Sequence, residues 1–508
     1  MDIDDLPDLV LEIVFSYLNQ YGDLENVRLV SRRWHRVAST VISILKKSFL
    51  RCNQLIWELC TAKNEGDGAI AKRCSHSGCY HDGTKKVYIF GGCTDNYTAF
   101  NDLWSFDLKS HNWCREFIKC APFPRPKAMS IFVPYKEYLI LHGGFAKSSP
   151  NPIHQAANFF SEIHMYDTMT NEWIEVETEP PPPVIASHCA CVVGDSLIVF
   201  GGSQNSRATN TVYVLDITTK IWHIPSFENH KDESCGKSDA TSSERFLLKN
   251  PQPNPRYGSS CVVIDKSHLL VIGGCGGPNC IYNDAWLLTF DLTLQTAWEW
   301  KEINITNPKS GPSQLWCHPA CPIGRNLACI SYARRNDRYG TISLNSCPAP
   351  LQVTSRNRIQ LPPCSMNDVA LQPSSTGDNV DHTLNEKLNF SSCQQSFSSL
   401  HAKNNLKYIN GASGATLGKN WYHKRRQGNA CVYILDTARV LEDCTVTWRQ
   451  QEIDLKAPDD TMLYSLCAGR GELIMFGGMR SDVQGDNPHP FTHIINNDIY
   501  ILSPARLV

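Results

Sequence analysis

Residues 87–113 read VYIFGGCTDNYTAFNDLWSFDLKSHNW and contain the pattern from which the architecture of the chain can be predicted. It begins with a run of β-branched and aromatic residues, which is typical of a strand. The run ends in the diglycine Gly91-Gly92, which supplies the positive φ or close backbone approach that residues with a Cβ resist. A second strand-like run, DLWSFDL, follows, and Trp113 comes six residues after Asp107. The stretch therefore predicts a strand, a sharp turn, a second strand and then a tryptophan-bearing strand.

The same pattern recurs along the chain. Diglycines that follow strand-like runs end at Gly92, Gly144, Gly202, Gly274 and Gly478. The six-residue spacing from Asp to Trp recurs at Asp167 with Trp173 and at Asp216 with Trp222. The first two diglycines lie 52 residues apart, which fits the period of about 50 residues that marks kelch blades. Because the sequence contains no Trp-Asp dipeptide, the WD type of propeller is disfavoured.

From residue 73 onward the chain resembles kelch repeats, which form four-stranded blades of a β-propeller. The last diglycine follows the fourth by 204 residues, and residues 340–428, rich in Ser, Asn, Gln and Gly, account for the excess as a disordered insertion. A degenerate fifth blade brackets this insertion. The last blade is one strand short, and LIWELC around Trp57 supplies that strand from ahead of the first blade. Six blades result, each with one fourth-strand tryptophan: Trp57, Trp113, Trp173, Trp222, Trp300 and Trp448.

Residues 2–43 carry apolar side chains at helical spacing. The pattern LPDLVLEIVFSYL, followed by VRLVSRRWHRVA, resembles an F-box, a three-helix unit that in its family docks a Skp-type adaptor. A unit of about 40 residues rarely buries enough apolar surface to be stable alone, so its surplus apolar surface is expected to bind a partner. The alternative is a helical hairpin that merely packs on the propeller. The resemblance places adaptor binding at Leu6, Pro7, Leu11, Ile13, Phe15, Leu18, Leu24, Val30 and Trp34.

The sequence thus predicts a multidomain chain, with a small all-α F-box followed by an all-β six-bladed kelch propeller that carries a disordered insertion. The predicted boundaries are 1–45 for the F-box, 46–54 for a linker, 55–339 for the closing strand, blades 1–4 and the first half of blade 5, 340–428 for the insertion, and 429–508 for the rest of the propeller.

One face of this propeller is expected to bind a target. In a four-strand antiparallel meander, the start of the first, innermost strand and the end of the second strand lie at the same end of the blade. The diglycine loops and the starts of the first strands therefore share one face of the propeller. These segments carry basic, imidazole and aromatic residues, which are common interface anchors. We expect an acidic or phosphorylated segment to bind there through Arg forks. The alternative is that each first-strand Arg or His bonds the backbone of a neighbouring blade. The predicted target-binding residues are Arg73, His76, Tyr97, Phe100, Arg125, Lys127, Phe145, His188, Arg207, Arg256, Tyr257, His318 and Arg480.

Composition limits the partners and the compartment. The 508 residues include 48 Lys plus Arg against 50 Asp plus Glu, a balance that excludes binding nucleic acid or an anionic membrane mainly through global charge. The first ten residues, MDIDDLPDLV, lack a basic stretch before an apolar one, and no uncharged apolar run approaches a membrane span. We therefore expect the cytoplasm, the nucleus or both. In those compartments the 22 cysteines act as small buried hydrophobes.

The two resemblances together imply the substrate receptor of an SCF (Skp-cullin-F-box) ubiquitin ligase. The F-box would dock the Skp-type adaptor and thereby a cullin-RING scaffold, while the propeller holds target proteins for ubiquitination and proteasomal degradation. No residue of this chain is then expected to be catalytic, and no cofactor or metal is expected. Two alternatives are a kelch scaffold that binds a filament without degradation and a kelch-fold enzyme. No HExxH, nucleophile elbow or phosphate loop supports the enzyme.

Overall fold

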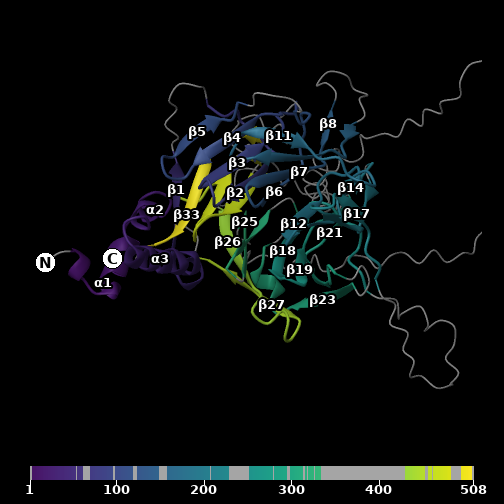
Figure 1. Ribbon diagram of the computed structural model, residues 1–508. Coiled ribbons are helices and arrows are strands. Elements are labelled where there is room, and N and C mark those ends of the chain that lie inside the picture. The colour runs from purple at the N-terminus through teal and green to yellow at the C-terminus, as the bar shows by residue number, and fades with distance from the viewer. Residues whose placement is uncertain are drawn as a thin grey trace, which may run out of the picture. The chain divides into compact units, whose positions relative to one another are not determined.

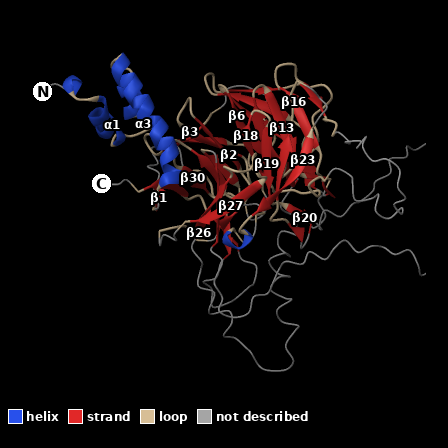
Figure 2. Cartoon of the chain, turned by 90° about the horizontal axis from the view of Figure 1, so that it is seen from below, coloured by secondary structure: helices blue, strands red, loops and turns tan. Residues whose placement is uncertain are grey.

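A computed structural model of the chain describes helices at the N-terminal end and strands through nearly all of the remaining regular structure (Figures 1 and 2). The described residues are 3–52, 54–60, 69–94, 98–117, 123–147, 157–205, 207–227, 251–277, 280–293, 298–312, 315–316, 319–324, 326–332, 430–451, 456–459, 461–481 and 493–505. The predicted insertion at 340–428 lies outside them. No helix in this described part is long and apolar enough to cross a membrane.

The N-terminal unit is helical, as its apolar spacing predicts. It contains the 3-10 helix η1 (Ile3–Asp5), α1 (Asp8–Ser16), α2 (Asp23–Val27) and α3 (Arg32–Arg51). Ser31 caps α3, because its side chain accepts a hydrogen bond of 3.1 Å from the Trp34 backbone N–H. Leu11, Phe15 and Leu24 are buried in a small core against α3.

Helix α3 runs on to Arg51, through most of the stretch that the sequence predicts as a linker. Ile42 and Leu45 pack in the core of the helical unit, and Phe49, on the same helical stripe, is buried among strands of blades 5 and 6. The predicted linker over 46–54 is therefore replaced mainly by helix, because Phe49 anchors the helix end in the propeller.

The strands form six four-stranded antiparallel blades, and the outer strands of blades 4 and 5 also pair in parallel, Asn304 with Thr445 and Ile305 with Val446, which joins these two blades into one eight-stranded sheet. Blade 1 contains β2 (Ser77–His81), β3 (Lys86–Phe90), β4 (Leu103–Asp107) and β5 (Asn112–Arg115). Blade 2 contains β6 (Ile131–Tyr135), β7 (Tyr138–His142), β10 (Ile163–Asp167) and β11 (Glu172–Glu175). Blade 3 contains β12 (Cys189–Val193), β13 (Ser196–Phe200), β16 (Val212–Asp216) and β17 (Ile221–His223). Blade 4 contains β18 (Ser260–Asp265), β19 (His268–Ile272), β22 (Ala285–Thr289) and β23 (Glu299–Ile305). Blade 5 contains β24 (Ala320–Ile323), β25 (Asn326–Tyr332), β26 (Ala430–Asp436) and β27 (Thr445–Gln450). Blade 6 contains β29 (Ser465–Ala468), β30 (Leu473–Phe476), β33 (Ile499–Pro504) and β1 (Leu55–Cys60).

Short strands extend from the loops after the diglycines. They pair as β8 (Phe145–Lys147) with β9 (Ala157–Phe159), β14 (Ser203–Gln204) with β15 (Arg207–Ala208), β20 (Cys275–Gly277) with β21 (Cys280–Ile281), and β28 (Thr461–Met462) with β31 (Met479–Ser481), which also pairs with β32 (His493–Ile495). A 3-10 helix, η3 (Pro308–Ser310), follows blade 4.

The blades close into a ring. The first strand of each blade contacts that of the next, in the cyclic order β2, β6, β12, β18, β24, β29 and back to β2. Strand β1 completes blade 6 by pairing with β33, with Trp57 opposite Leu502, and the two strands lie side by side in Figure 1. The N-terminal closing strand therefore confirms the six-bladed prediction and covers the edge of β33 that blade 6 would otherwise expose.

The diglycines join each blade to the following one. Gly201 has a φ of 65°, and a Cβ there would lie 2.7 Å from the carbonyl oxygen of Arg256 in the next blade. The Gly202 N–H donates to the same oxygen at 2.7 Å. The equivalent bonds run from Gly92 to Lys127, Gly144 to Ile185, Gly274 to Leu315 and Gly478 to Arg73. Only glycine allows both the conformation and this approach, which explains the repeat.

The fourth-strand tryptophans fill the spaces between blades. Each packs in the core shared by its own blade and the preceding one: Trp57 between blades 6 and 5, Trp113 between 1 and 6, Trp173 between 2 and 1, Trp222 between 3 and 2, Trp300 between 4 and 3, and Trp448 between 5 and 4. Their constant spacing in the sequence thus reflects one repeated packing contact.

Candidate adaptor and target-binding surfaces

Helix α1 is apolar on two opposite faces. Leu11 and Phe15 point into the core of the helical unit. On the other face Leu9 is 68% exposed and Ile13 is 54% exposed. A helix that is apolar all round is normally buried on every side. The outer face of α1 is therefore an apolar surface that none of the described residues covers.

The adaptor face is defined here as the exposed apolar residues of α1, of its C-cap residue and of the segment before α3: Leu9, Val10, Ile13, Val14, Tyr17, Leu29 and Val30. Leu29, at 84%, is the most exposed of them. So many exposed apolar side chains in one small helical unit are rare on a surface that meets only water.

The predicted adaptor residues divide between this face and the core behind it. Pro7, Ile13 and Val30 are exposed. Leu11, Phe15 and Leu24 are buried, while Leu6, Leu18 and Trp34 pack partly against them. Sequence reasoning missed Leu9, Val10, Val14, Tyr17 and Leu29. The missed residues of α1 and its C-cap fall at the helical spacing i, i+1, i+5 and i+8, which marks a second face on the helix.

The start of the chain is fixed to α3 by charged groups. Asp8 forms ion pairs with Arg33 at 2.8 Å and with Arg36 at 2.9 Å, and the hydrogen bonds from these two guanidinium groups lower the pKa of Asp8. The Trp34 indole N–H donates to the Asp4 carboxylate at 2.8 Å. These contacts hold the first turn of α1 in place, so that its outer face is presented in one orientation.

On the propeller, the structure contradicts the predicted basic ring. The Arg73 side chain has no exposed area and forms a bidentate pair with Asp102, at 2.7 and 2.9 Å. It also donates to the Gly91 carbonyl at 3.0 Å, and Phe100 covers the guanidinium at 4.3 Å from the ring centroid. Burial alone would raise the pKa of Asp102, but Arg73 reverses the direction and lowers that pKa.

Two other blades repeat this arrangement. In blade 4, Arg256 is fully buried and pairs with Asp284 at 2.6 and 2.9 Å. In blade 2, Lys127 is fully buried and pairs with Glu162 at 2.9 Å. Arg73, Lys127 and Arg256 therefore cannot act as free Arg or Lys anchors for a target. Their side chains link the start of the first strand to the start of the third strand of their own blade, so the alternative that they bond the backbone of a neighbouring blade is also wrong for these three residues.

Sequence reasoning missed the acidic partners of these cations. Asp102, Glu162 and Asp284 each stand at or next to the start of the third strand of their blade. The sequences NDLW and NDAW contain two of them, and the indole N–H of Trp104 and of Trp286 donates to the same carboxylates at 2.7 and 2.8 Å. The repeated Asp before Leu-Trp or Ala-Trp was the available signal.

The remaining predicted target residues have mixed positions. His76, Phe145, His188 and Tyr257 are buried, so the prediction that they contact a target is wrong for them. Phe100 is half-buried. Arg480 is half-buried and pairs with Asp459 at 2.7 Å. Arg125, with a side chain 69% exposed, pairs with Glu162 at 2.6 Å, and Arg207 is exposed. Tyr97 and His318 lie outside the described residues.

Comparison with known families agrees with both parts of the chain. Residues 73–298 match the family model described as "FBX42, beta-propeller domain", and residues 3–51 match the model described as "F-box-like". The chain is an F-box/kelch-type protein related to F-box only protein 42. AFNDLW at 99–104 and GGCGGPN at 273–279 carry this closer resemblance, together with WCHPAC at 316–321.

Individual relatives are more distant. The chain is 24% identical over 314 residues to "Kelch domain-containing protein 1" of Mus musculus, an alignment of 58% of this chain and 68% of that protein. It is 25% identical over 283 residues to the Homo sapiens protein of that name, across 52% of this chain and 62% of the relative. The matched region thus spans about two thirds of the length of these relatives. A solved structure titled "Structure of YjhT" aligns with a TM-score of 0.43 and 13% identity, covering 80% of this chain and 91% of that one.

The F-box of this F-box/kelch-type protein contacts the propeller through a buried arginine. The Arg470 side chain is 3% exposed and pairs with Glu25 of α2 at 2.6 Å and with Asp82 of blade 1 at 2.9 Å. It also donates to the Gln20 carbonyl at 2.9 Å. Arg470 and Asp82 lie in turns between first and second strands. Since each second strand runs from that turn to its diglycine, the F-box and the diglycine loops occupy opposite faces of the propeller.

Buried histidines make the stability of the propeller dependent on pH. Burial lowers the pKa of His76 and of His142 to about 3. In the unfolded chain a histidine titrates near 6.5. Because the unfolded state then binds the extra protons, the free energy of unfolding is expected to fall as the pH drops below about 6.5, by roughly 2 kcal/mol per histidine at pH 5.

Urea unfolding at pH 7.5, 6.0 and 5.0 measures this loss. His142 stands before its diglycine where blades 1, 3 and 6 carry phenylalanine, so His142→Phe provides a matched variant. It is expected to fold and to lose less stability between pH 6.5 and 5 than the wild type does. An identical pH dependence of the two proteins would contradict the assignment of His142.

Proposed function

We propose that this protein is the substrate receptor of an SCF ubiquitin ligase, in which the adaptor face binds the Skp-type adaptor and the propeller binds a target protein. The observation that carries the proposal is the two-sided α1 helix, because its inner face completes the F-box core and its outer face is exposed in the part of the chain that the structure describes. An F-box joined to a kelch propeller supports a substrate-adaptor role of the SCF type in general. Ubiquitin transfer and degradation of the target are the finer part of the proposal.

The chain itself supplies position rather than bond chemistry in this scheme. The target lysines would be brought to a RING-bound conjugating enzyme at a high effective concentration, which is the gain that linked binding sites provide. The F-box/kelch architecture is typical of non-catalytic adaptors. The compartment in which this would occur is the cytoplasm, the nucleus or both.

The target is proposed to bind the diglycine face, opposite the F-box. Arg125 and Arg207 remain there as exposed cations, Phe100 as a half-buried ring and Arg480 as a half-buried cation. These are the members of the predicted set that are still available to a ligand. An acidic or phosphorylated segment fits exposed Arg side chains, which bind carboxylate and phosphate through two N–H groups.

The test is a reconstituted ligase. The full chain, the Skp-type adaptor, the cullin-RING scaffold and the activating and conjugating enzymes are incubated with cell extract, and the ubiquitinated proteins are identified by mass spectrometry. We expect a set of targets that disappears with the adaptor-face double variant Leu9→Asp/Ile13→Asp. Arg207→Glu is expected to reduce target modification while adaptor binding is kept. A set of modified proteins that is the same with and without an intact adaptor face would refute the proposal and favour a kelch scaffold without a ligase role.

A further inference from the structure

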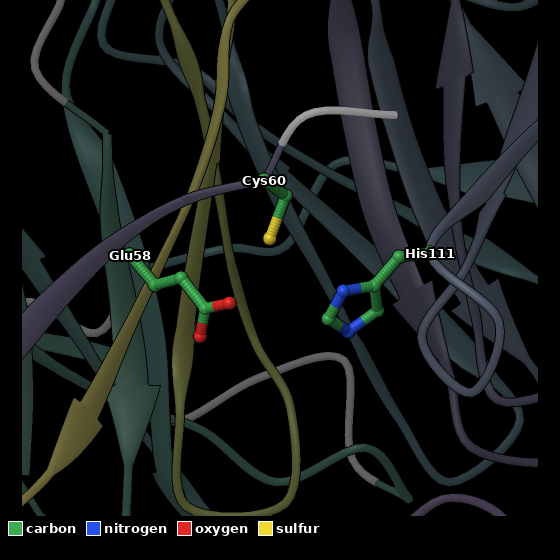
Figure 3. Close-up of side chains that lie close together, drawn as sticks. All are labelled: Glu58, Cys60 and His111. Carbon is green, nitrogen blue, oxygen red and sulfur yellow. The ribbon is translucent and has the colours of Figure 1, made fainter. Parts of the chain in front are cut away.

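Three metal-binding side chains meet at the seam where the ring of blades closes. Glu58 and Cys60 come from the closing strand β1, and His111 comes from the turn between β4 and β5 of blade 1. One carboxylate oxygen, the thiol sulfur and one imidazole nitrogen all lie within 4.8 Å of one another. In Figure 3 the three side chains converge on one space from two separate segments of the chain.

The fold gives these three groups no other polar partner among the residues that the structure describes. No described hydrogen bond or ion pair reaches the Glu58 carboxylate, the Cys60 thiol or the His111 ring. Around a tetrahedral zinc ion with bonds of about 2.0–2.3 Å, the ligand atoms lie roughly 3.3–3.8 Å apart. The observed grouping is therefore close to the size of a site that contracts slightly around a cation.

The backbone holds the three groups in place. Glu58 and Cys60 are two residues apart on a paired strand, so they share the same side of it. His111 has a φ of 59°, its backbone N–H donates to the Asp107 carbonyl at 2.8 Å, and its ring stacks on Phe106 with the ring centroids 5.8 Å apart. Cys60 is buried, His111 is half-buried and Glu58 is exposed, which leaves the site accessible from solvent through Glu58.

The donor set selects the class of ion. Magnesium and calcium take oxygen ligands, so a thiolate and an imidazole disfavour them. A cysteine, a histidine and a carboxylate together suit zinc, which binds sulfur, nitrogen and oxygen with tetrahedral geometry. We propose that Glu58, Cys60 and His111 form a zinc site that joins the closing strand to blade 1, with water in the fourth position. Zinc would replace the Cys60 thiol proton, which passes to solvent.

The position gives the site a structural purpose. Strand β1 follows α3 directly and is held in blade 6 by pairing with β33. A metal bond to His111 would attach it to blade 1 as well. Because the metal binds the folded state, it is expected to raise the melting temperature of the full chain, and a chelator is expected to reverse that rise.

Cobalt titration of the chelator-treated full chain tests the site, because a cobalt–thiolate bond gives a charge-transfer absorption that a carboxylate or imidazole site lacks. We expect the wild type to bind one cobalt ion with this absorption and zinc to displace it. His111→Asn tolerates the positive φ and is expected to weaken binding by at least about tenfold, and Glu58→Gln, at an exposed position, is expected to weaken it too.

Cys114→Ser is the matched control. Cys114 is an exposed cysteine on β5, close in sequence to His111 but outside the cluster, so this variant is expected to bind cobalt as the wild type does. Circular dichroism and the melting temperature without metal show whether each variant is folded. Absence of the thiolate absorption in the wild type, or wild-type affinity in both His111→Asn and Glu58→Gln, would overturn the proposal.

Discussion

Replacing Arg73 or Arg256 by alanine is expected to lower the free energy of unfolding of the propeller by about 3–5 kcal/mol, the range for breaking a buried ion pair by removing one partner. Asp102 and Asp284 would keep their charges with side chains only 13% and 25% exposed. Each blade would also lose the hydrogen bonds to Gly91 or Gly273 that tie the first strand to the diglycine. Urea unfolding at pH 7.5 measures the loss.

Two variants make this prediction specific. Arg125→Ala removes a cation from the same face, but its side chain is 69% exposed, so a change of no more than about 1 kcal/mol is expected. Arg73→Lys is expected to recover part of the loss, because Lys127 fills the equivalent position in blade 2. Equal destabilisation by Arg73→Ala and Arg125→Ala would contradict the claim that burial of the Arg73–Asp102 pair causes the loss of stability.

The double variant Leu9→Asp/Ile13→Asp is expected to weaken binding of the Skp-type adaptor at least about 100-fold, since two apolar anchors worth about 2 kcal/mol each would be lost. Both residues are exposed in the isolated chain. The stability of the chain is therefore expected to change by no more than about 0.5 kcal/mol per residue. Isothermal titration of the purified adaptor into each protein measures the affinity.

Leu11→Ala is the contrasting variant on the same helix. Leu11 has no exposed area, so its truncation is expected to destabilise the F-box core by about 2–5 kcal/mol while the outer face keeps its residues. If Leu9→Asp/Ile13→Asp left the affinity unchanged and Leu11→Ala alone abolished binding, the adaptor would depend on F-box folding and not on the adaptor face.

The repeat pattern was readable from the sequence because each repeated residue has one physical reason. Gly201 and Gly202 approach the next blade too closely for a Cβ, and Trp222 fills the space toward the preceding blade. The closing strand around Trp57 followed from the need to complete blade 6. Periodic residues under the same constraint in every blade thus reveal both the fold and the number of blades.

The binding surfaces were less readable, because residue type alone does not tell an exposed cation from a buried one. Arg125 and Lys127 both precede the first strand of blade 2 and both pair with Glu162, yet Arg125 is exposed and Lys127 is buried. Only Lys127 stands where Arg73 stands in blade 1, and the two-residue offset between the neighbouring cations decides which of them is buried. Likewise, Ile13 and Leu11 are both apolar, and only packing against α3 separates the adaptor face from the core.

Hydrogen–deuterium exchange of the full wild-type chain, with and without the purified Skp-type adaptor, tests whether the adaptor binds the adaptor face. We predict that the adaptor slows exchange in α1 and in residues 28–31, and leaves the diglycine loops on the opposite face of the propeller unchanged. Failure of a folded wild-type chain to bind the adaptor, or protection confined to the diglycine loops, would contradict it.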